Sequence, residues 1–345
     1  MEDAVVLAES VFGTTYGKTA NGLVRFSRRY NVRYVIDSSH AGEDAGMILN
    51  GKKCGIPVVP ALPVNADPPL STLVVGVATD GGVLPSKYRK FIADALKSGL
   101  NVVSGLHEFL SDDPEFAKLA SKNGRSITDV RKMFRDRKDM FTGRILDVKS
   151  TKIAVLGTDS AVGKRTTSVF LSESMKKKGN TSEMIGTGQT SWMQGFKYTI
   201  VLDAIINDFV SGALETVTVE AWNDLHPDYM FLEGQGSVLH PAYPGSFEII
   251  GALHPDAIVL QHSPKRLYYD GFEKFKIPPL EKYIRILELL SDKKVIAVAI
   301  NRDDMTNSEM LDYMDMVEKK YGIPAFDPLG NLDHITAYIQ DTLGK

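Results

Sequence analysis

The stretch from Ile153 to Thr167 has the residue types that a phosphate-binding loop requires. A short apolar run ends at Gly157, a polar loop follows, and Gly163-Lys164 open a predicted helix. The amides of such a loop converge on an anion, the helix N-terminus adds partial positive charge, and the lysine adds a full one. We expect the bound phosphates to contact Gly157, Thr158, Asp159, Ser160, Ala161, Val162, Gly163, Lys164, Arg165 and Thr166.

Two positions of this loop depart from the usual pattern G-x-x-x-x-G-K-[ST]. Thr158 stands where the first glycine belongs, with Gly157 just before it. Arg165 stands where the metal-binding hydroxyl belongs, with Thr166 one residue later. The arginine argues against Mg·ATP in particular as the ligand. If the site does depend on Mg²⁺, Thr166 and Glu233 are its expected ligands.

A second motif lies downstream, where the apolar run Tyr229-Met-Phe-Leu ends at Glu233 and Gly-Gln-Gly-Ser237 follows. A strand that ends in an acid is typical of a Walker B motif, whose carboxylate binds Mg²⁺ directly or through water. The glycines let the backbone pass close to a ligand. We therefore expect Glu233 in the site, with Gln235 and Ser237 on its substrate side.

The N-terminal half carries weaker signals. Asp37 ends a predicted strand about twenty residues after a glycine turn, as a ribose-binding acid does in dinucleotide-binding folds. The G-x-G-x-x-G fingerprint is absent, however, so the sequence favours a Rossmann-like scaffold without NAD. Asp80 follows the predicted strand 73–78. Because ligands of open parallel sheets bind beyond the carboxyl ends of the strands, Asp37 and Asp80 are further substrate-side candidates.

Composition limits the remaining possibilities. A chain of 345 residues is long enough for two domains, and 43% apolar with 24% charged residues is ordinary for a globular protein. The net charge of −3 gives no general attraction to nucleic acid or anionic membrane, and a single cysteine excludes a disulfide framework. No signal peptide or membrane-spanning run is evident, so we expect a cytoplasmic protein with a small-molecule substrate. Self-association into a homo-oligomer is compatible with the sequence.

The order of predicted elements sets the architecture. Strands alternate with helices along the whole chain, which predicts parallel α/β sheets. We expect a Rossmann-like domain over residues 1–145 and a doubly wound, P-loop NTPase-like domain over residues 146–345. One helix is predicted from Ser126 to about Asp139, because Ser126-Ile-Thr-Asp129 has the form of a capping sequence.

These motifs resemble two known families. Gly157-Thr-Asp-Ser-Ala-Val-Gly-Lys and Glu233-Gly-Gln-Gly resemble the motifs of dethiobiotin synthetase, which has threonine straight after the lysine. A second resemblance covers almost the whole chain and is to the D-glutamate N-acetyltransferase family. It rests on both C-terminal motifs, with Ser-x-x-His-Pro after the second, and on Gly17-Lys-Thr-Ala, Ile36-Asp-Ser and Thr79-Asp-Gly-Gly.

The second resemblance implies transfer of acetyl from acetyl-CoA to the amino group of D-glutamate or a similar acidic amino acid. The loop would then hold the CoA phosphates, and Arg165 would pair with a phosphate or a substrate carboxylate. Acyl transfer needs a base for the ammonium group and donors for an oxyanion. Glu233 and His240 are the candidate bases, the amides of residues 234–237 the candidate donors, and Lys164 the third catalytic candidate.

Two other functions stay open from the residues alone. One is ATP- and Mg²⁺-dependent activation or phosphorylation of a small carboxylate or amine, as the resemblance to dethiobiotin synthetase implies. The other is a nucleotide-binding regulator without catalysis.

Overall fold

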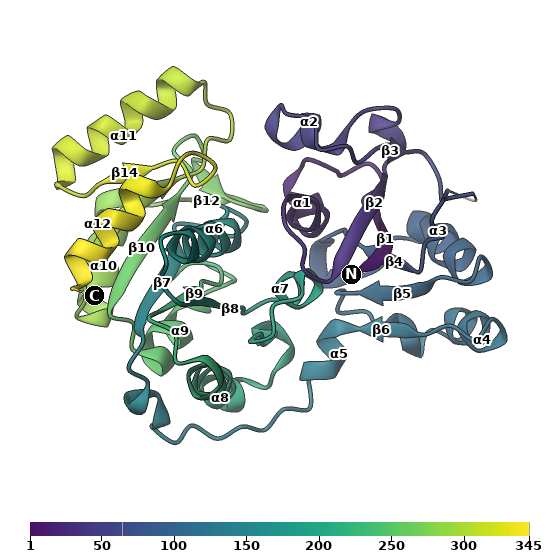
Figure 1. Ribbon diagram of the computed structural model, residues 1–345, viewed down its shortest axis with the longest axis horizontal. Helices are drawn as coiled ribbons and strands as arrows, with labels where there is room; N and C mark the ends of the chain where they lie inside the picture. The colour runs from purple at the N-terminus through teal and green to yellow at the C-terminus, as the bar shows by residue number, and fades with distance from the viewer. Residues whose placement is uncertain (64, 345) are drawn as a thin grey trace. The chain divides into compact units, whose positions relative to one another are not determined.

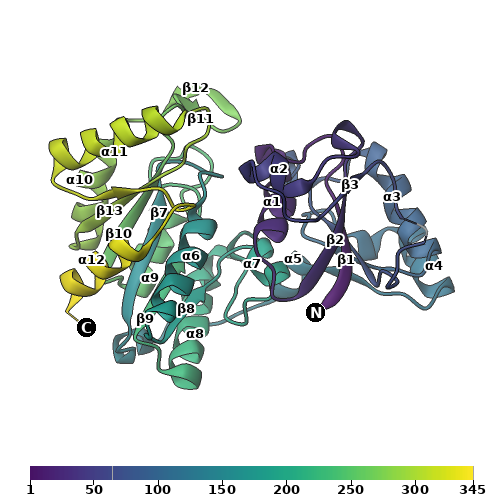
Figure 2. The ribbon, with the colours of Figure 1, turned by 45° about the horizontal axis from the view of Figure 1, so that its top comes forward.

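The structure is a computed structural model that describes residues 1–63 and 65–344, and the chain forms two compact units (Figures 1 and 2). The N-terminal unit comprises Met1–Asp136 and Gln189–Lys197, and Arg137–Gly188 with the chain from Tyr198 onward forms the C-terminal unit. The sequence predicts one boundary after residue 145. Residues 137–145 and 189–197 therefore lie in different units from those expected.

The N-terminal unit is built on a six-stranded parallel sheet in the order β3-β2-β1-β4-β5-β6. This is the strand order of dinucleotide-binding Rossmann folds, which confirms the predicted Rossmann-like scaffold. Its elements are β1 (Glu2–Leu7), α1 (Lys18–Arg25), β2 (Tyr30–Ile36), α2 (Ala45–Asn50), β3 (Val58–Val59), β4 (Thr72–Val75), α3 (Ser86–Lys97), β5 (Asn101–Ser104), α4 (Pro114–Lys122), β6 (Ile127–Asp129), α5 (Val130–Phe134) and α7 (Gln189–Gln194).

The helix predicted from Ser126 to about Asp139 is wrong at both ends. Ile127–Asp129 form the edge strand β6, in which Thr128 pairs with Val103 of β5, and only Val130–Phe134 are helical. Asp129 uses its carboxylate to accept the amides of Leu110 and Ser111, at 2.9 and 2.8 Å. The pairing and these long-range bonds replace the helix start that the local pattern suggested.

Helix α7 belongs to the N-terminal unit although it follows β8 of the other unit in the chain. It packs beside α1 and α5 (Figure 1). Nε2 of Gln194 donates to the carbonyls of Gly22 and Phe26, at 2.8 and 3.0 Å. The hydroxyls of Thr190 and Thr19 lie 2.9 Å apart, and the guanidinium of Arg29 lies over the Trp192 ring. These contacts hold α7 against α1 and the residues that follow it, within the Rossmann-like unit.

The C-terminal unit has a second parallel sheet, in the order β14-β13-β10-β7-β9-β8. Helices α6 and α12 pack together, as do α8 with α9 and α9 with α10, so both faces of the sheet are covered (Figure 1). The doubly wound fold is thus confirmed. Its elements are β7 (Thr151–Gly157), α6 (Lys164–Lys177), β8 (Ser182–Ile185), α8 (Asn207–Leu225), β9 (Tyr229–Glu233), α9 (Ser246–Leu253), β10 (Ala257–His262), α10 (Leu280–Ser291), β13 (Val295–Ile300), α11 (Asn307–Tyr321), β14 (Ala325–Phe326) and α12 (Asp333–Leu343).

Strand β7 lies in the middle of this sheet, and every one of its residues is buried. The antiparallel hairpin β11 (Tyr268–Tyr269) and β12 (Phe272–Lys276) stands outside the six-stranded sheet (Figure 2). Of the helices that the structure describes, none combines the length and apolar character needed to cross a membrane.

Candidate active site

The phosphate loop connects the central strand β7 to helix α6, as the sequence predicts. Ala161 and Gly163 have positive φ angles of 51° and 108°, so the loop turns sharply into the helix. Nζ of Lys164 folds back and donates to the carbonyl of Asp159, at 2.6 Å. A Cβ on Gly157 would lie 2.9 Å from Cδ of Lys164, so a larger residue there would require the lysine side chain to shift.

Neighbouring strands hold the loop in place. The amide of Thr158 donates to the carbonyl of Gln261 at 3.0 Å, and its hydroxyl lies 3.0 Å from Nδ1 of His262 at the end of β10. Nδ2 of Asn301, just after β13, donates to the carbonyl of Val162 at 3.0 Å. Residues at the ends of two strands on one side of β7 therefore hold the loop in place. Thr158 has a structural role, because it makes two of these contacts.

Asp159 is the buried centre of a polar cluster behind the loop. Its Oδ2 accepts from Arg266 at 3.0 Å and from the amide of Asp270 at 2.9 Å, and its Oδ1 lies 3.3 Å from Nε2 of His240. Burial alone would raise the pKa of Asp159, but the contacts with His240, Asp270 and Arg266 outweigh it and lower the pKa. The carboxylate is thus kept ionised and serves to connect segments that are distant in sequence.

The hydrogen bonds of His240 define its tautomer. Nδ1 accepts the amides of Ala242 and Tyr243, each at 3.0 Å, so this nitrogen carries no proton. The proton of the neutral ring is then on Nε2, which faces Asp159. The ring is buried among aromatic neighbours, including Tyr269 and Phe272. In this arrangement neither ring nitrogen has a lone pair directed at solvent, which does not fit the role of a general base.

Glu233 lies at the end of β9, next to the phosphate-loop strand. It pairs with Val155 of β7 in the sheet register. Its Oε1 lies 2.9 Å from Nε of Arg165, and its Oε2 accepts the amide of Thr187 at 2.9 Å. The hydroxyl of Thr187 donates to the carbonyl of Glu233, also at 2.9 Å. The structure thus brings together Arg165 and Glu233, two residues that the sequence placed in the site separately.

The segment after Glu233 is only partly available for a ligand. The amide of Gly234 donates to Val155 and that of Ser237 to Tyr243, both at 3.0 Å, so these two cannot serve as oxyanion donors. Nε2 of Gln235 donates to the carbonyl of Thr187 at 3.0 Å. Ser237 is buried, and its hydroxyl lies 3.3 Å from that of Tyr283, which gives it a structural partner.

Several buried polar atoms near the loop lack a hydrogen-bond partner. Among the described side chains these atoms include Oγ of Ser160, Nε of Arg165 and Nε2 of His240. The Arg165 and His240 nitrogens each lie at ion-pair distance from a carboxylate oxygen, but neither N–H makes a hydrogen bond of good geometry to it. Ser160 and Arg165 therefore keep donors that phosphate oxygens can accept, which suits a phosphate-bearing ligand.

Two residues that are not among the predicted site residues join this site. Thr187 follows β8 and binds Glu233, whereas Arg266 follows β10 and binds Asp159. Both are polar residues just beyond a strand of the same parallel sheet. Their position at the carboxyl ends of these strands is the signal by which they could have been found.

The N-terminal candidates show a different environment. Asp37 is fully buried, and its two oxygens accept the amides of Phe12 and Ser39, both at 2.9 Å. Burial opposes ionisation, but these bonds and that of the Ser39 hydroxyl leave the pKa of Asp37 lowered. Asp37 therefore braces the β1–α1 loop and has no oxygen left for a ribose. The backbone of Asp80 begins a short 3-10 helix, and its side chain lies outside the described ones.

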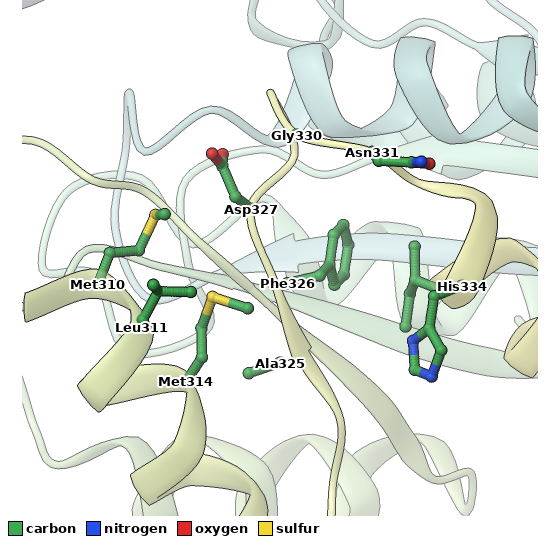
Figure 3. Close-up of a pocket in the computed structure, with 10 residues that line it drawn as sticks. Met310, Leu311, Met314, Ala325, Phe326, Asp327, Gly330, Asn331 and His334 are labelled. Carbon is green, nitrogen blue, oxygen red and sulfur yellow. The ribbon is translucent and has the colours of Figure 1, made fainter. Parts of the chain in front are cut away.

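A cavity of about 360 Å³ lies at the β14 edge of the C-terminal sheet. The thioethers of Met310 and Met314 lie on one side of the Phe326 ring and His334 on the other (Figure 3). Its described lining is mostly apolar and contains no lysine or arginine, so it does not suit a phosphate. None of the predicted site residues lines it. No cluster of three His, Cys, Asp or Glu side chains that could hold a metal ion occurs within the described residues.

A Rossmann-like unit and a P-loop unit in one chain define the structural class of this protein. Residues 38–133 match a domain of unknown function described as Rossmann-like, the N-terminal domain of DUF1611. Residues 139–336 match the DUF1611 P-loop domain. The chain therefore belongs to the DUF1611 family.

Relatives of this chain include a crystallised DUF1611 family protein from Anabaena variabilis. That protein is 28% identical, and the match covers 99% of this chain and all of that chain with a TM-score of 0.89. A protein of Tritonibacter scottomollicae named D-glutamate N-acetyltransferase is 33% identical over 74% of this chain and 77% of its own length. A protein of the same name from Pseudoalteromonas is 31% identical over 77% of this chain and 80% of its own length. The resemblance to the D-glutamate N-acetyltransferase family, which the motifs indicated, is thus confirmed.

Proposed function

We propose that this protein transfers an acetyl group from acetyl-CoA to the amino group of a small acidic amino acid of the D-glutamate kind. The supporting observation is the phosphate loop with its available donors, in a chain whose relatives are named D-glutamate N-acetyltransferases. Coenzyme A carries a pyrophosphate and a 3′-phosphate, so a loop of this kind suits it. When bound, acetyl-CoA supplies the activated acetyl group.

The residues of the loop hold the phosphates in this proposal. The loop amides and Lys164 attract the anion at the N-terminus of α6, and the Ser160 hydroxyl donates to a phosphate oxygen. Lys164 must release the Asp159 carbonyl to reach a phosphate, which a flexible four-carbon stem allows.

Glu233 is the proposed proton acceptor for the ammonium group of the amino acid. Its carboxylate is oriented by Arg165 and by the Thr187 amide, which fixes the direction of its oxygens. His240 has a different part: it holds Asp159 behind the loop, because Nδ1 is already occupied by two amides. A carboxylate oxygen, unlike a ring nitrogen, has two lone pairs and can accept more than one hydrogen bond, so we propose Glu233 rather than His240 as the base.

Calorimetric titration with acetyl-CoA tests the binding step. We expect binding to the unaltered protein and a loss of at least tenfold in affinity for Lys164→Ala, since a charge-assisted contact disappears. Lys177→Ala, at the exposed far end of the same helix, is the matched control and should bind normally. Affinity for Mg·ATP with none for acetyl-CoA would instead favour the ATP-dependent alternative.

An acetylation assay with D- and L-glutamate tests the reaction itself. Glu233→Gln should keep acetyl-CoA affinity within a few-fold and lose most of its turnover, because the amide cannot accept the proton. Full turnover in this variant would remove Glu233 from the proposed role. Ligand binding that changes association with another protein, without any turnover of glutamate, would favour the regulator.

A further inference from the structure

The two residues that would hold Mg²⁺ in an ordinary P-loop site pair with each other here. Such sites use the hydroxyl directly after the loop lysine and the carboxylate at the end of the Walker B strand. In this chain those positions are Arg165 and Glu233, and Nε of Arg165 lies 2.9 Å from Oε1 of Glu233. A cation of the protein therefore occupies the place beside this carboxylate.

The donor set at this place does not fit a divalent cation. A guanidinium has five N–H donors, no acceptor and a permanent positive charge, so Arg165 cannot ligate Mg²⁺. The second oxygen of Glu233 accepts the Thr187 amide at 2.9 Å. Thr166 cannot replace the missing hydroxyl, because successive helix residues point about 100° apart around the axis.

We propose that Arg165 is a built-in replacement for the divalent cation, so that the loop binds phosphates without Mg²⁺. This inference rests on the proposed function and says which side chain neutralises the charge of the bound phosphates. Glu233 holds the guanidinium at the start of α6, one residue from Lys164. Nε of Arg165 makes no well-directed hydrogen bond to Glu233, and its side chain is 20% exposed. Because Nε is itself buried, we expect a phosphate oxygen to reach the terminal nitrogens of the guanidinium.

Charge balance supports the same assignment. Lys164 and Arg165 are two adjacent cations beside one carboxylate, Glu233, so together the three side chains carry a single net positive charge. A pyrophosphate diester carries only one negative charge on each phosphorus. A nucleoside triphosphate carries more charge, and P-loop enzymes offset it with Mg²⁺. A site in which arginine replaces the metal suits a diester such as that of coenzyme A.

The test compares two phosphate probes, acetyl-CoA and ADP, with and without metal. Each is titrated calorimetrically into the full-length protein in excess Mg²⁺ and in EDTA. We expect acetyl-CoA affinity to change by less than about twofold between the two conditions. Arg165→Thr restores the usual hydroxyl and exposes Glu233, so it should lose at least tenfold affinity in EDTA and regain part of it in Mg²⁺. Arg285→Thr, on the exposed side of α10, is the control and should behave like the unaltered protein.

The outcomes separate this inference from the proposed function. If acetyl-CoA fails to bind but ADP binds equally well in EDTA, the acetyltransferase proposal fails and the role of Arg165 stands. If either probe binds only with Mg²⁺, the replacement is refuted. Absence of binding by both probes would refute the loop as a phosphate site and with it both proposals.

Discussion

Nε2 of His240 lies 3.3 Å from Oδ1 of Asp159, and neither side chain is exposed to solvent. The two residues are far apart in sequence, yet their contact ties the segment after β9 to the phosphate loop. A buried carboxylate depends on such partners, because an unpaired charge away from water is costly.

We predict that His240→Ala lowers the free energy of unfolding by about 1–3 kcal/mol, since it leaves the Asp159 charge with one partner fewer. Urea denaturation measures the effect. In an Asp159→Asn background the same change should cost less, because no charge remains to be stabilised. Equal costs in the two backgrounds would show that the pair does not interact.

The second prediction concerns pH and His262. Burial lowers the pKa of His262 to about 4, whereas a histidine of the unfolded chain titrates near its ordinary value of 6.5. Between these values the unfolded chain binds the extra proton, so the free energy of unfolding falls as the pH falls from 6.5 towards 4. The full effect is about 3 kcal/mol, and above pH 6.5 this residue adds no pH dependence.

Urea denaturation between pH 7 and pH 4.5 checks this prediction when it is repeated on His262→Asn. The variant lacks the titrating ring, so its stability should decrease less steeply with acid than that of the unaltered protein. Parallel curves would assign the acid sensitivity to other groups, such as Asp159.

The third prediction tests the close approach of backbone at Gly234. A Cβ there would lie 2.4 Å from the carbonyl oxygen of Val155 and 3.0 Å from Cδ of Lys164. Gly234→Ala should therefore destabilise the protein by about 2 kcal/mol or more, because the strand or the lysine must shift. Gly251→Ala is the matched control: it lies in helix α9 with open space around it. Alanine there should stabilise by about 0.5–1 kcal/mol, and thermal unfolding of both variants gives the comparison.

The fourth prediction tests whether Asp37 stabilises the fold or binds a ligand. Asp37→Ala removes the acceptor of the Phe12 and Ser39 amides, so stability should fall by about 1–3 kcal/mol. Glu43→Ala, nearby and exposed, should change it by less than about 0.5 kcal/mol. Addition of NAD to the unaltered protein should leave its melting temperature unchanged. A clear rise would show that Asp37 is available to a ribose after all.

The phosphate loop could be predicted from sequence because its determinants are local. Strand, glycine, lysine and helix follow one another within fifteen residues, and backbone geometry then places Lys164 at the helix N-terminus. The alternation of strands and helices likewise predicted both parallel sheets. The structure adds that the aliphatic stem of Lys164 passes close to Gly157.

Contacts between segments that are distant in the chain could not be predicted from the sequence. The residue pairs Asp159–His240 and Arg165–Glu233 form because different strands of one sheet end side by side, and no spacing reveals which side chains meet there. The strand at Ile127–Asp129 was missed for the same reason. Its pairing with β5 outweighed a helix-like local pattern.

The assignment of residues 189–197 to the N-terminal unit has a consequence for synthesis on the ribosome. The ribosome makes β7, α6 and β8 before it makes this segment, so the Rossmann-like unit acquires its last helix only after these have emerged. A nascent chain that stops at residue 136 lacks the partners of Gly22 and Phe26. The order of translation thus interleaves the completion of the two units, and a gene fragment that encodes residues 1–136 specifies an incomplete Rossmann-like unit.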